Sequence, residues 1–241
     1  MQLLHRTHID SQSIEAVTFR HINIVDIVWV FTIASVLGLI GETLVSYPID
    51  GVWKNRTGFV WGMFSPIYGV GAVLMTVMGD NTRHRGPLAV FLACAVAGAG
   101  LEFFGGYTLE KFFGICAWDY SSDPLSFMGY TSLSFAALWG ALGLLWTEYV
   151  LPHIPGALDK LPHKLYQYGA VGLALFFTAD SVATIVAFDC WWCELAGQAA
   201  TTPFQQFLMS HFSDAYMTGK FQTITIWPDT ATRNALMLLP R

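Results

Sequence analysis

Long apolar segments separated by short polar loops dominate the chain. A helix needs about 20 mainly apolar residues to cross a bilayer, and the apolar segments run over residues 24–45, 62–78, 88–107, 131–151 and 166–188. Residues 203–218 form a shorter amphipathic segment that adds a crossing only if it inserts. The pattern therefore predicts an all-α fold, a polytopic membrane helix bundle of five spans, or six.

Three regions follow from this pattern. A polar N-terminal tail covers residues 1–23, a transmembrane bundle covers 24–190, and an amphipathic segment and tail cover 191–241. The N-terminal tail lacks an apolar core followed by a small-residue cleavage site, so it is not a removable signal peptide. The first span is then expected to target the chain, and the C-terminal tail contains a β-like run over residues 221–227.

Composition and charge agree with a membrane location. Hydrophobic residues make up 54% of the chain and charged residues only 12%, a balance typical of integral membrane proteins. The slightly acidic net charge argues against nucleic acid as a partner. The lysines and arginines of the short loops, counted with those of the tail before the first span, indicate a multi-pass protein of the cell membrane with a cytoplasmic N-terminus.

Five carboxylates lie within the apolar segments; Asp26 and Glu148 lie at segment edges, and the other three are candidates for function. Glu42 lies near the end of the first, Glu102 lies inside the third, and Asp180 lies near the middle of the fifth. An ionisable group inside a membrane is costly and usually functional, although it can also serve only as a hydrogen-bonding link between helices. Asp180 is expected to face the bundle interior and to be neutral, or ionised only while a cation is bound.

The first two hairpins are similar to each other. A glycine stands one helical turn before each of Glu42 and Glu102, and Tyr68 and Trp139 occupy matching positions in the second span of each hairpin. Two parallel span–loop–span repeats would explain the match, and coincidence is the alternative because glycine and aromatic residues are common in membrane proteins. A repeat predicts that both carboxylates lie at the same membrane level, where the two polar loops pack together.

The loops carry complementary charge. Lys54 and Arg56 lie in the first loop, whereas Glu110 and Asp119 flank the second. A partly dehydrated ion pair is stronger than an exposed one, so a pair between the loops is expected. Contacts with Glu42 or with lipid headgroups are the alternatives.

Signals for other chemistry are missing from the sequence. Gly219-Lys220 has neither the following Ser or Thr nor the preceding glycine of a phosphate-binding loop, so we expect no enzyme and no cofactor. An intramembrane enzyme using Glu42, Glu102 and Asp119 is a further interpretation. Cys190 and Cys193 have redox-motif spacing without the strand-then-helix context of that motif; a disulfide or free thiols remain open, and no metal site is expected.

Two long motifs surround the polar loops. The first runs from Asn55-Arg56-Thr57-Gly58-Phe59 through Gly62 to Pro66-Ile67-Tyr68-Gly69-Val70-Gly71. The second comprises Leu101-Glu102, Leu109-Glu110-Lys111-Phe112-Phe113, Trp118-Asp119-Tyr120-Ser121, Pro124, Gly129 and Trp139-Gly140. Both motifs resemble the Putative ABC-transporter type IV family. The chain departs from the family pattern where Thr57 is inserted, and where Met128 and Tyr130 replace the usual Asn and basic residue. The resemblance implies a multi-span bacterial membrane protein of the permease type.

The sequence thus predicts a permease-type membrane subunit that is embedded in the lipid bilayer and moves or binds a small solute or lipid. Its expected partner is a separate ATPase subunit, and a homo-oligomer is a further option. The alternative is a non-transporting accessory, assembly or sensor protein. The candidate substrate or coupling residues are Glu42, Glu102, Asp180 and Asp119. The candidate loop and motif residues are Lys54, Asn55, Arg56, Pro66, Tyr68, Glu110, Lys111, Trp118, Tyr120 and Trp139.

Overall fold

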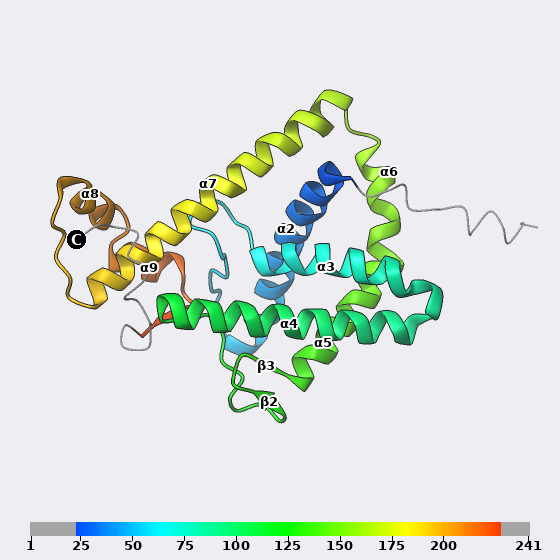
Figure 1. Ribbon diagram of the computed structural model, residues 1–241, viewed down its shortest axis with the longest axis horizontal. Helices are drawn as coiled ribbons and strands as arrows, with labels where there is room; N and C mark the ends of the chain where they lie inside the picture. Colours follow the sequence, from blue (N-terminus) through cyan, green and yellow to red (C-terminus); the bar gives the residue numbers. More distant parts are fainter. Residues whose placement is uncertain (1–22, 228–241) are drawn as a thin grey trace, which may run out of the picture.

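The computed structural model describes residues 23–227, and most of them are helical (Figure 1). The helices are α2 (Ile24–Asp50), α3 (Pro66–Thr82), α4 (Pro87–Phe113), α5 (Leu133–Leu145), α6 (Ile154–Leu158), α7 (His163–Leu195), α8 (Pro203–His211) and α9 (Asp214–Lys220). Short 3-10 turns cover Arg83–Arg85 and Leu151–His153, and a π-helical turn covers Trp146–Val150. The predicted N-terminal tail, apart from residue 23, lies outside the described residues.

Four helical stretches are long and apolar enough to cross a membrane. They cover Ile24–Ile49, Pro87–Phe113, Leu133–Leu158 and His163–Leu195. The second predicted span coincides with α3, whose 17 residues fall slightly short of the usual length of a spanning helix. The predicted helical membrane architecture is therefore present, with four candidate spanning helices in the described part of the chain.

Local sequence signals explain where the main helices begin and end. Asn23 caps α2 through its side chain and forms a capping box with Asp26, an arrangement that satisfies free amides of the first turn. Pro66 is the first residue of α3, a position where its missing N–H costs nothing. Gly51 and Gly114 end α2 and α4 in the left-handed conformation, with φ of 71° and 65°, which glycine adopts without steric penalty.

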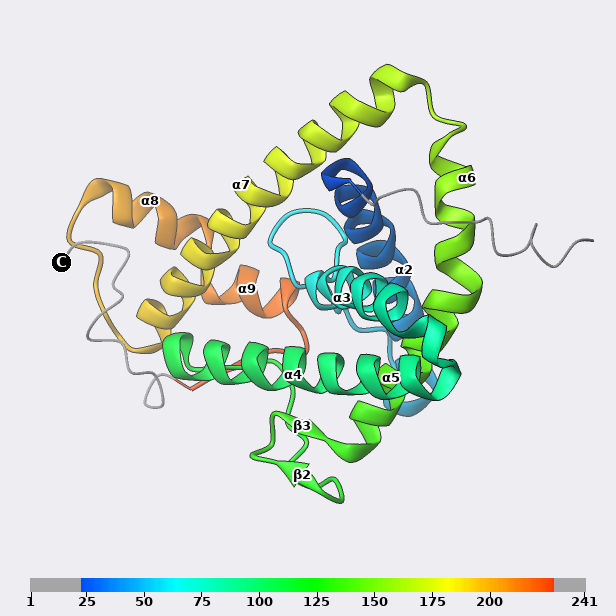
Figure 2. The same cartoon turned by 45° about the vertical axis from the view of Figure 1, so that its right-hand side comes forward.

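Consecutive helices pack side by side. The pairs α2–α3, α3–α4 and α4–α5 make the most extensive contacts, and α7 also contacts α2 (Figures 1 and 2). The core between these helices contains Val90 and Cys94 of α4 and Trp139 of α5, all buried. The π-helical turn directs the Trp146 indole N–H to Thr76 Oγ1 of α3, at 2.8 Å.

The C-terminal segment folds back onto the end of α7. Phe221, Met217 and Phe212 pack with Phe188 and Trp191 of α7 in a second core. Strand β4 (Thr225–Ile226), inside the predicted β-like run, pairs antiparallel with β1 (Ile115–Cys116), which directly follows α4. Helices α8 and α9 have nine and seven residues, so each is too short to form the sixth span.

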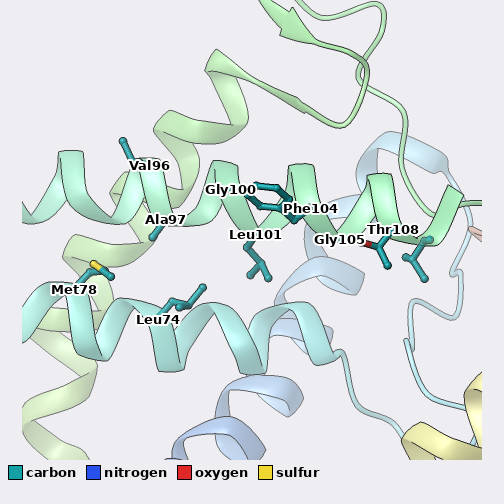
Figure 3. Close-up of a pocket in the computed structure, with 10 residues that line it drawn as sticks. Leu74, Met78, Val96, Ala97, Gly100, Leu101, Phe104, Gly105 and Thr108 are labelled. Carbon is teal, nitrogen blue, oxygen red and sulfur yellow. The ribbon is translucent and has the colours of Figure 1, made fainter. Parts of the chain in front are cut away.

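An apolar groove of about 720 Å³ runs between α3 and α4 (Figure 3). Leu74 and Met78 of α3 line it together with Leu101 and Phe104 of α4. Neither Glu42 nor Glu102 lines this groove. The groove therefore offers a lipid-like surface rather than a polar route to the carboxylates.

Candidate functional site

Glu102 is the most fully engaged acidic side chain of the candidate set. It is 4% exposed. The Tyr120 hydroxyl donates to its Oε1 at 3.1 Å and the Thr131 hydroxyl donates to its Oε2 at 3.0 Å. The Trp139 indole lies within hydrogen-bonding reach of the same carboxylate. Both oxygens of Glu102 are therefore occupied by donors from the second loop and α5.

Glu42 is held from the first loop. Arg56 Nη1 lies 3.1 Å from Glu42 Oε1, in a hydrogen-bonded ion pair that is partly exposed. The Tyr68 hydroxyl of α3 is within hydrogen-bonding reach of the same carboxylate. Asn55 shapes the loop just before Arg56, because its Oδ1 accepts the Thr57 N–H at 3.1 Å.

Tyr68 joins the two halves. Its phenol interacts electrostatically with both Glu42 and Glu102, and its ring centroid lies 6.0 Å from that of Trp139. The structure thus brings the two carboxylates together in the C-terminal halves of α2 and α4. We call this set the carboxylate cluster; its members are Glu42, Arg56, Tyr68, Glu102, Tyr120, Thr131 and Trp139.

Two loop side chains hold the carboxylates: the protonated phenol of Tyr120 binds Glu102, and the guanidinium of Arg56 binds Glu42. Burial raises the pKa of the Tyr120 phenol, and the nearby Glu102 charge raises it further. Tyr120 therefore stays protonated and donates its hydrogen bond at any physiological pH. The same ring stacks on Phe135 of α5, with centroids 4.0 Å apart, so the second loop is anchored by both polar and apolar contacts.

Two glycines make room for the aromatic members of the carboxylate cluster. A Cβ atom on Gly38 would overlap the Tyr68 side chain, and one on Gly98 would overlap the Trp139 side chain. Each glycine lies one helical turn before the carboxylate of its helix. Glycine at these positions therefore permits the approach of α3 to α2 and of α5 to α4.

Other candidate loop residues lie outside the carboxylate cluster. Asp119 is exposed and accepts from the Ser121 N–H at 2.8 Å and the Ser121 hydroxyl at 2.5 Å. These bonds lower the pKa of Asp119, so it remains ionised as part of a turn. Lys111 pairs with Glu110 at 2.9 Å.

The first loop makes one of the contacts given as alternatives to a charge pair between the loops. Arg56 pairs with Glu42 of its own hairpin, which was one of the alternatives. Trp118 donates its indole N–H to the Tyr130 carbonyl at 2.9 Å and packs beside Gly106. Pro66 packs against Gly58, where any side chain would collide with its ring. These motif residues therefore shape the loops, whereas Glu42 and Glu102 form the polar centre.

Asp180 forms a separate buried site. Its Oδ1 accepts from the Trp61 N–H at 2.9 Å and from Thr184 Oγ1 at 3.4 Å. Thr184 in turn accepts the Val60 N–H at 3.0 Å. Oδ2 is buried and makes no hydrogen bond with the described residues. Asp180 faces the protein interior, as expected, and fixes the first loop to α7.

The C-terminal segment holds both ends of the same loop. Lys220 donates to the Gly62 carbonyl at 3.0 Å, and Gln222 accepts the Asn55 N–H at 2.8 Å. Phe221 between them is buried in the core on α7. We call residues 220–222 the clasp. Burial lowers the pKa of Lys220 and the neighbouring Asp180 opposes that effect, so the two sites are electrostatically linked.

Comparison with known protein families identifies the family of the chain. A family model described as "Putative ABC-transporter type IV" matches residues 29–185, more than half of the chain. The chain belongs to this family. No solved structure matches it. Together with the four apolar helices, the match makes the chain a transport-related membrane protein of the ABC-transporter type IV family. The carboxylate cluster lies inside the matched region, and the clasp lies outside it.

Proposed function

We propose that this protein is the permease-type subunit of a membrane transporter for a small solute or lipid, powered by a separate ATPase subunit. One observation carries the proposal: carboxylates from two different helices meet in one polar cluster that two loops close. Membrane proteins rarely bury such groups without a task. Glu42 and Glu102 are the proposed substrate-contacting residues, and Asp180 is the proposed coupling residue.

The cluster suggests two equivalent half-sites. In each hairpin, an aromatic side chain rests on a glycine and points its donor at the carboxylate one turn further along the helix. Tyr68 does so for Glu42, and Trp139 does so for Glu102. We infer that the hairpins are parallel repeats, and that Met128 and Tyr130 leave the second half without the basic residue that Arg56 supplies in the first.

The orientation follows from the same proposal. With a cytoplasmic N-terminus in a bacterial plasma membrane, α2 runs outward, and the carboxylate cluster lies in the outer half of the membrane. The cluster is then a closed outer gate. Opening it requires breaking the Arg56–Glu42, Tyr120–Glu102 and Thr131–Glu102 contacts. Hydrogen bonds to charged groups contribute about 1.5–3 kcal/mol each, so opening needs an input such as substrate binding or a nucleotide-driven change in the partner.

The alternative is a non-transporting accessory subunit, and the engagement of both Glu102 oxygens supports it. A carboxylate used only to link helices would have the same contacts. The two functions differ in one respect that needs no knowledge of the substrate. A permease must expose the interior beside the cluster to each membrane face in turn, whereas an accessory bundle can stay closed. For either function we propose no enzymatic activity.

Accessibility of Ser35 tests the proposal. Its hydroxyl is buried in α2 without a hydrogen bond to the described residues, against Gly69 of α3. We would replace the four native cysteines by alanine, introduce Ser35→Cys, and reconstitute the full chain in liposomes. A membrane-impermeant maleimide is expected to label Cys at this position slowly from both faces, and faster after Glu102→Gln removes the negative charge from the gate.

Two further positions act as controls. Val90→Cys lies in the core toward the other end of α4 and should stay unlabelled, while Ser122→Cys is exposed on the second loop and should react rapidly from one face. If Ser35→Cys remains as unreactive as Val90→Cys in both backgrounds, the permease function is wrong and the accessory function stands.

A further inference from the structure

The hairpin of the second loop presents a small apolar tip. Strands β2 (Ser126–Phe127) and β3 (Thr131–Ser132) pair antiparallel, with Phe127 opposite Thr131. Leu125, Phe127 and Met128 are 75%, 60% and 65% exposed. The hairpin projects beside the start of α5 in both views (Figures 1 and 2). Three exposed apolar side chains therefore stand together within a loop that is otherwise largely polar.

The backbone of this tip is strained. Leu125 and Met128 both have φ of 55°, a left-handed conformation that residues with a Cβ atom avoid and glycine adopts freely. Surrounding bonds hold it: Ser126 N–H donates to the Asp123 carbonyl, and Tyr130 N–H donates to the Phe127 carbonyl, each at 3.2 Å. A strained conformation maintained by its surroundings points to a function. Here it keeps two apolar side chains outside the protein core.

The tip lies alongside α4 rather than beyond its end. The rings of Phe127 and Phe103 are 5.2 Å apart. Phe103 lies nearly three helical turns, about 15 Å, before the last residue of α4. The 27 residues of α4 measure about 40 Å along the axis, whereas the hydrocarbon core of a bilayer is about 30 Å thick. A side chain packed at Phe103 is therefore at the depth of acyl chains or their boundary with the headgroups.

Neighbouring surfaces are apolar as well. Leu133, which follows β3 directly, and Phe104 of α4 are exposed. Both belong to helical stretches long and apolar enough to span a membrane. The tip is thus continuous with surfaces that face lipid in a membrane-inserted chain.

We propose that the tip inserts Leu125, Phe127 and Met128 into the acyl-chain region of the bilayer beside α4 and α5, so that it anchors the second loop in lipid. The inference rests on the proposed membrane insertion of these helices. Because Thr131 and Tyr120 of the same loop hold Glu102, lipid contact at the tip would act directly on the loop side of the carboxylate cluster.

Nitroxide accessibility tests this placement. The full chain, with its native cysteines replaced, would carry Met128→Cys labelled with a spin probe in phosphatidylcholine liposomes. The ratio of collision rates with oxygen, which concentrates in lipid, to those with a water-soluble nickel chelate is expected to match that of a label at Phe104→Cys. It should be several-fold higher than at Ser122→Cys, an exposed position on the same loop. Leu125→Cys provides a second site if Met128→Cys does not fold.

Two results would overturn the inference. A tip label with the water exposure of Ser122→Cys would place the tip outside lipid. A tip label shielded from both reagents would mean that protein, such as a second copy of the chain, covers it. A Phe104→Cys label that is itself in water would instead contradict membrane insertion of α4, so failure of the proposed function is distinguishable from failure of the anchor.

Discussion

Replacing Phe221 by alanine is expected to lower the free energy of unfolding by about 3–5 kcal/mol, the usual range for loss of a buried phenylalanine. Phe221 is 1% exposed, and its ring centroid lies 4.9 Å from that of Phe188 on α7. The flanking Lys220 and Gln222 both hold the first loop. The loss should therefore loosen that loop as well as the C-terminal core. Equilibrium unfolding of the detergent-solubilised chain by a denaturing detergent measures the effect.

Phe204→Ala is the matched control. Phe204 lies in the same C-terminal segment, on α8, and is 64% exposed, so its removal should change the free energy of unfolding by less than about 0.5 kcal/mol. Equal losses for the two variants would show that Phe221 does not have the buried role that the clasp requires.

Alanine at the two glycines that contact Tyr68 and Trp139 is expected to cause the next largest loss of stability. Gly38→Ala and Gly98→Ala each place a methyl group into the side chain of Tyr68 or Trp139. Overpacking of this kind typically costs about 1–3 kcal/mol, and the aromatic ring must move away from its carboxylate. Thermal unfolding in detergent should show a lowered midpoint for both variants.

Each helix contains its own control for these substitutions. A Cβ atom on Gly41 of α2 or Gly100 of α4 would meet no atom within 4 Å. Alanine is the better helix former by up to about 1 kcal/mol, so Gly41→Ala and Gly100→Ala should leave stability unchanged or raise it. If Gly38→Ala and Gly98→Ala have the same unfolding midpoints as the control variants, these glycines are not needed for the close approach of α3 to α2 and of α5 to α4.

The helical architecture was predictable because apolar length and loop composition are local properties of the sequence. The predicted first and third spans differ from α2 and α4 mainly at their C-terminal ends, because both helices continue beyond the apolar run as far as the glycines that end them. The short α3 shows the limit of this reasoning. Its helix begins at Pro66, four residues after the start of the apolar run. The preceding loop donates the Val60 and Trp61 amides to Thr184 and Asp180 of α7, contacts that no local pattern records.

The site was predictable only in part. Glu42 and Glu102 were identifiable because a carboxylate in an apolar segment is unusual, and Tyr68 and Trp139 were identifiable as a matching pair. The structure adds Thr131 and the clasp residues Lys220 and Gln222. These side chains are ordinary for their local sequence, and their importance comes from contacts between segments far apart in the chain. Asp119 stood out in the sequence as an acidic residue of the second loop, but its partners are the neighbouring Ser121 atoms.

The distance between the two loops tests the proposed gate most directly. Spin labels at Val52→Cys and Ser122→Cys, both exposed and one on each loop, would report it by pulsed electron resonance in liposomes. The proposal predicts two distance populations, with Glu42→Gln combined with Glu102→Gln shifting the balance toward the longer one, because the charged contacts that close the gate are then weakened. A single narrow distance that is the same in the parent and the doubly substituted protein would contradict it.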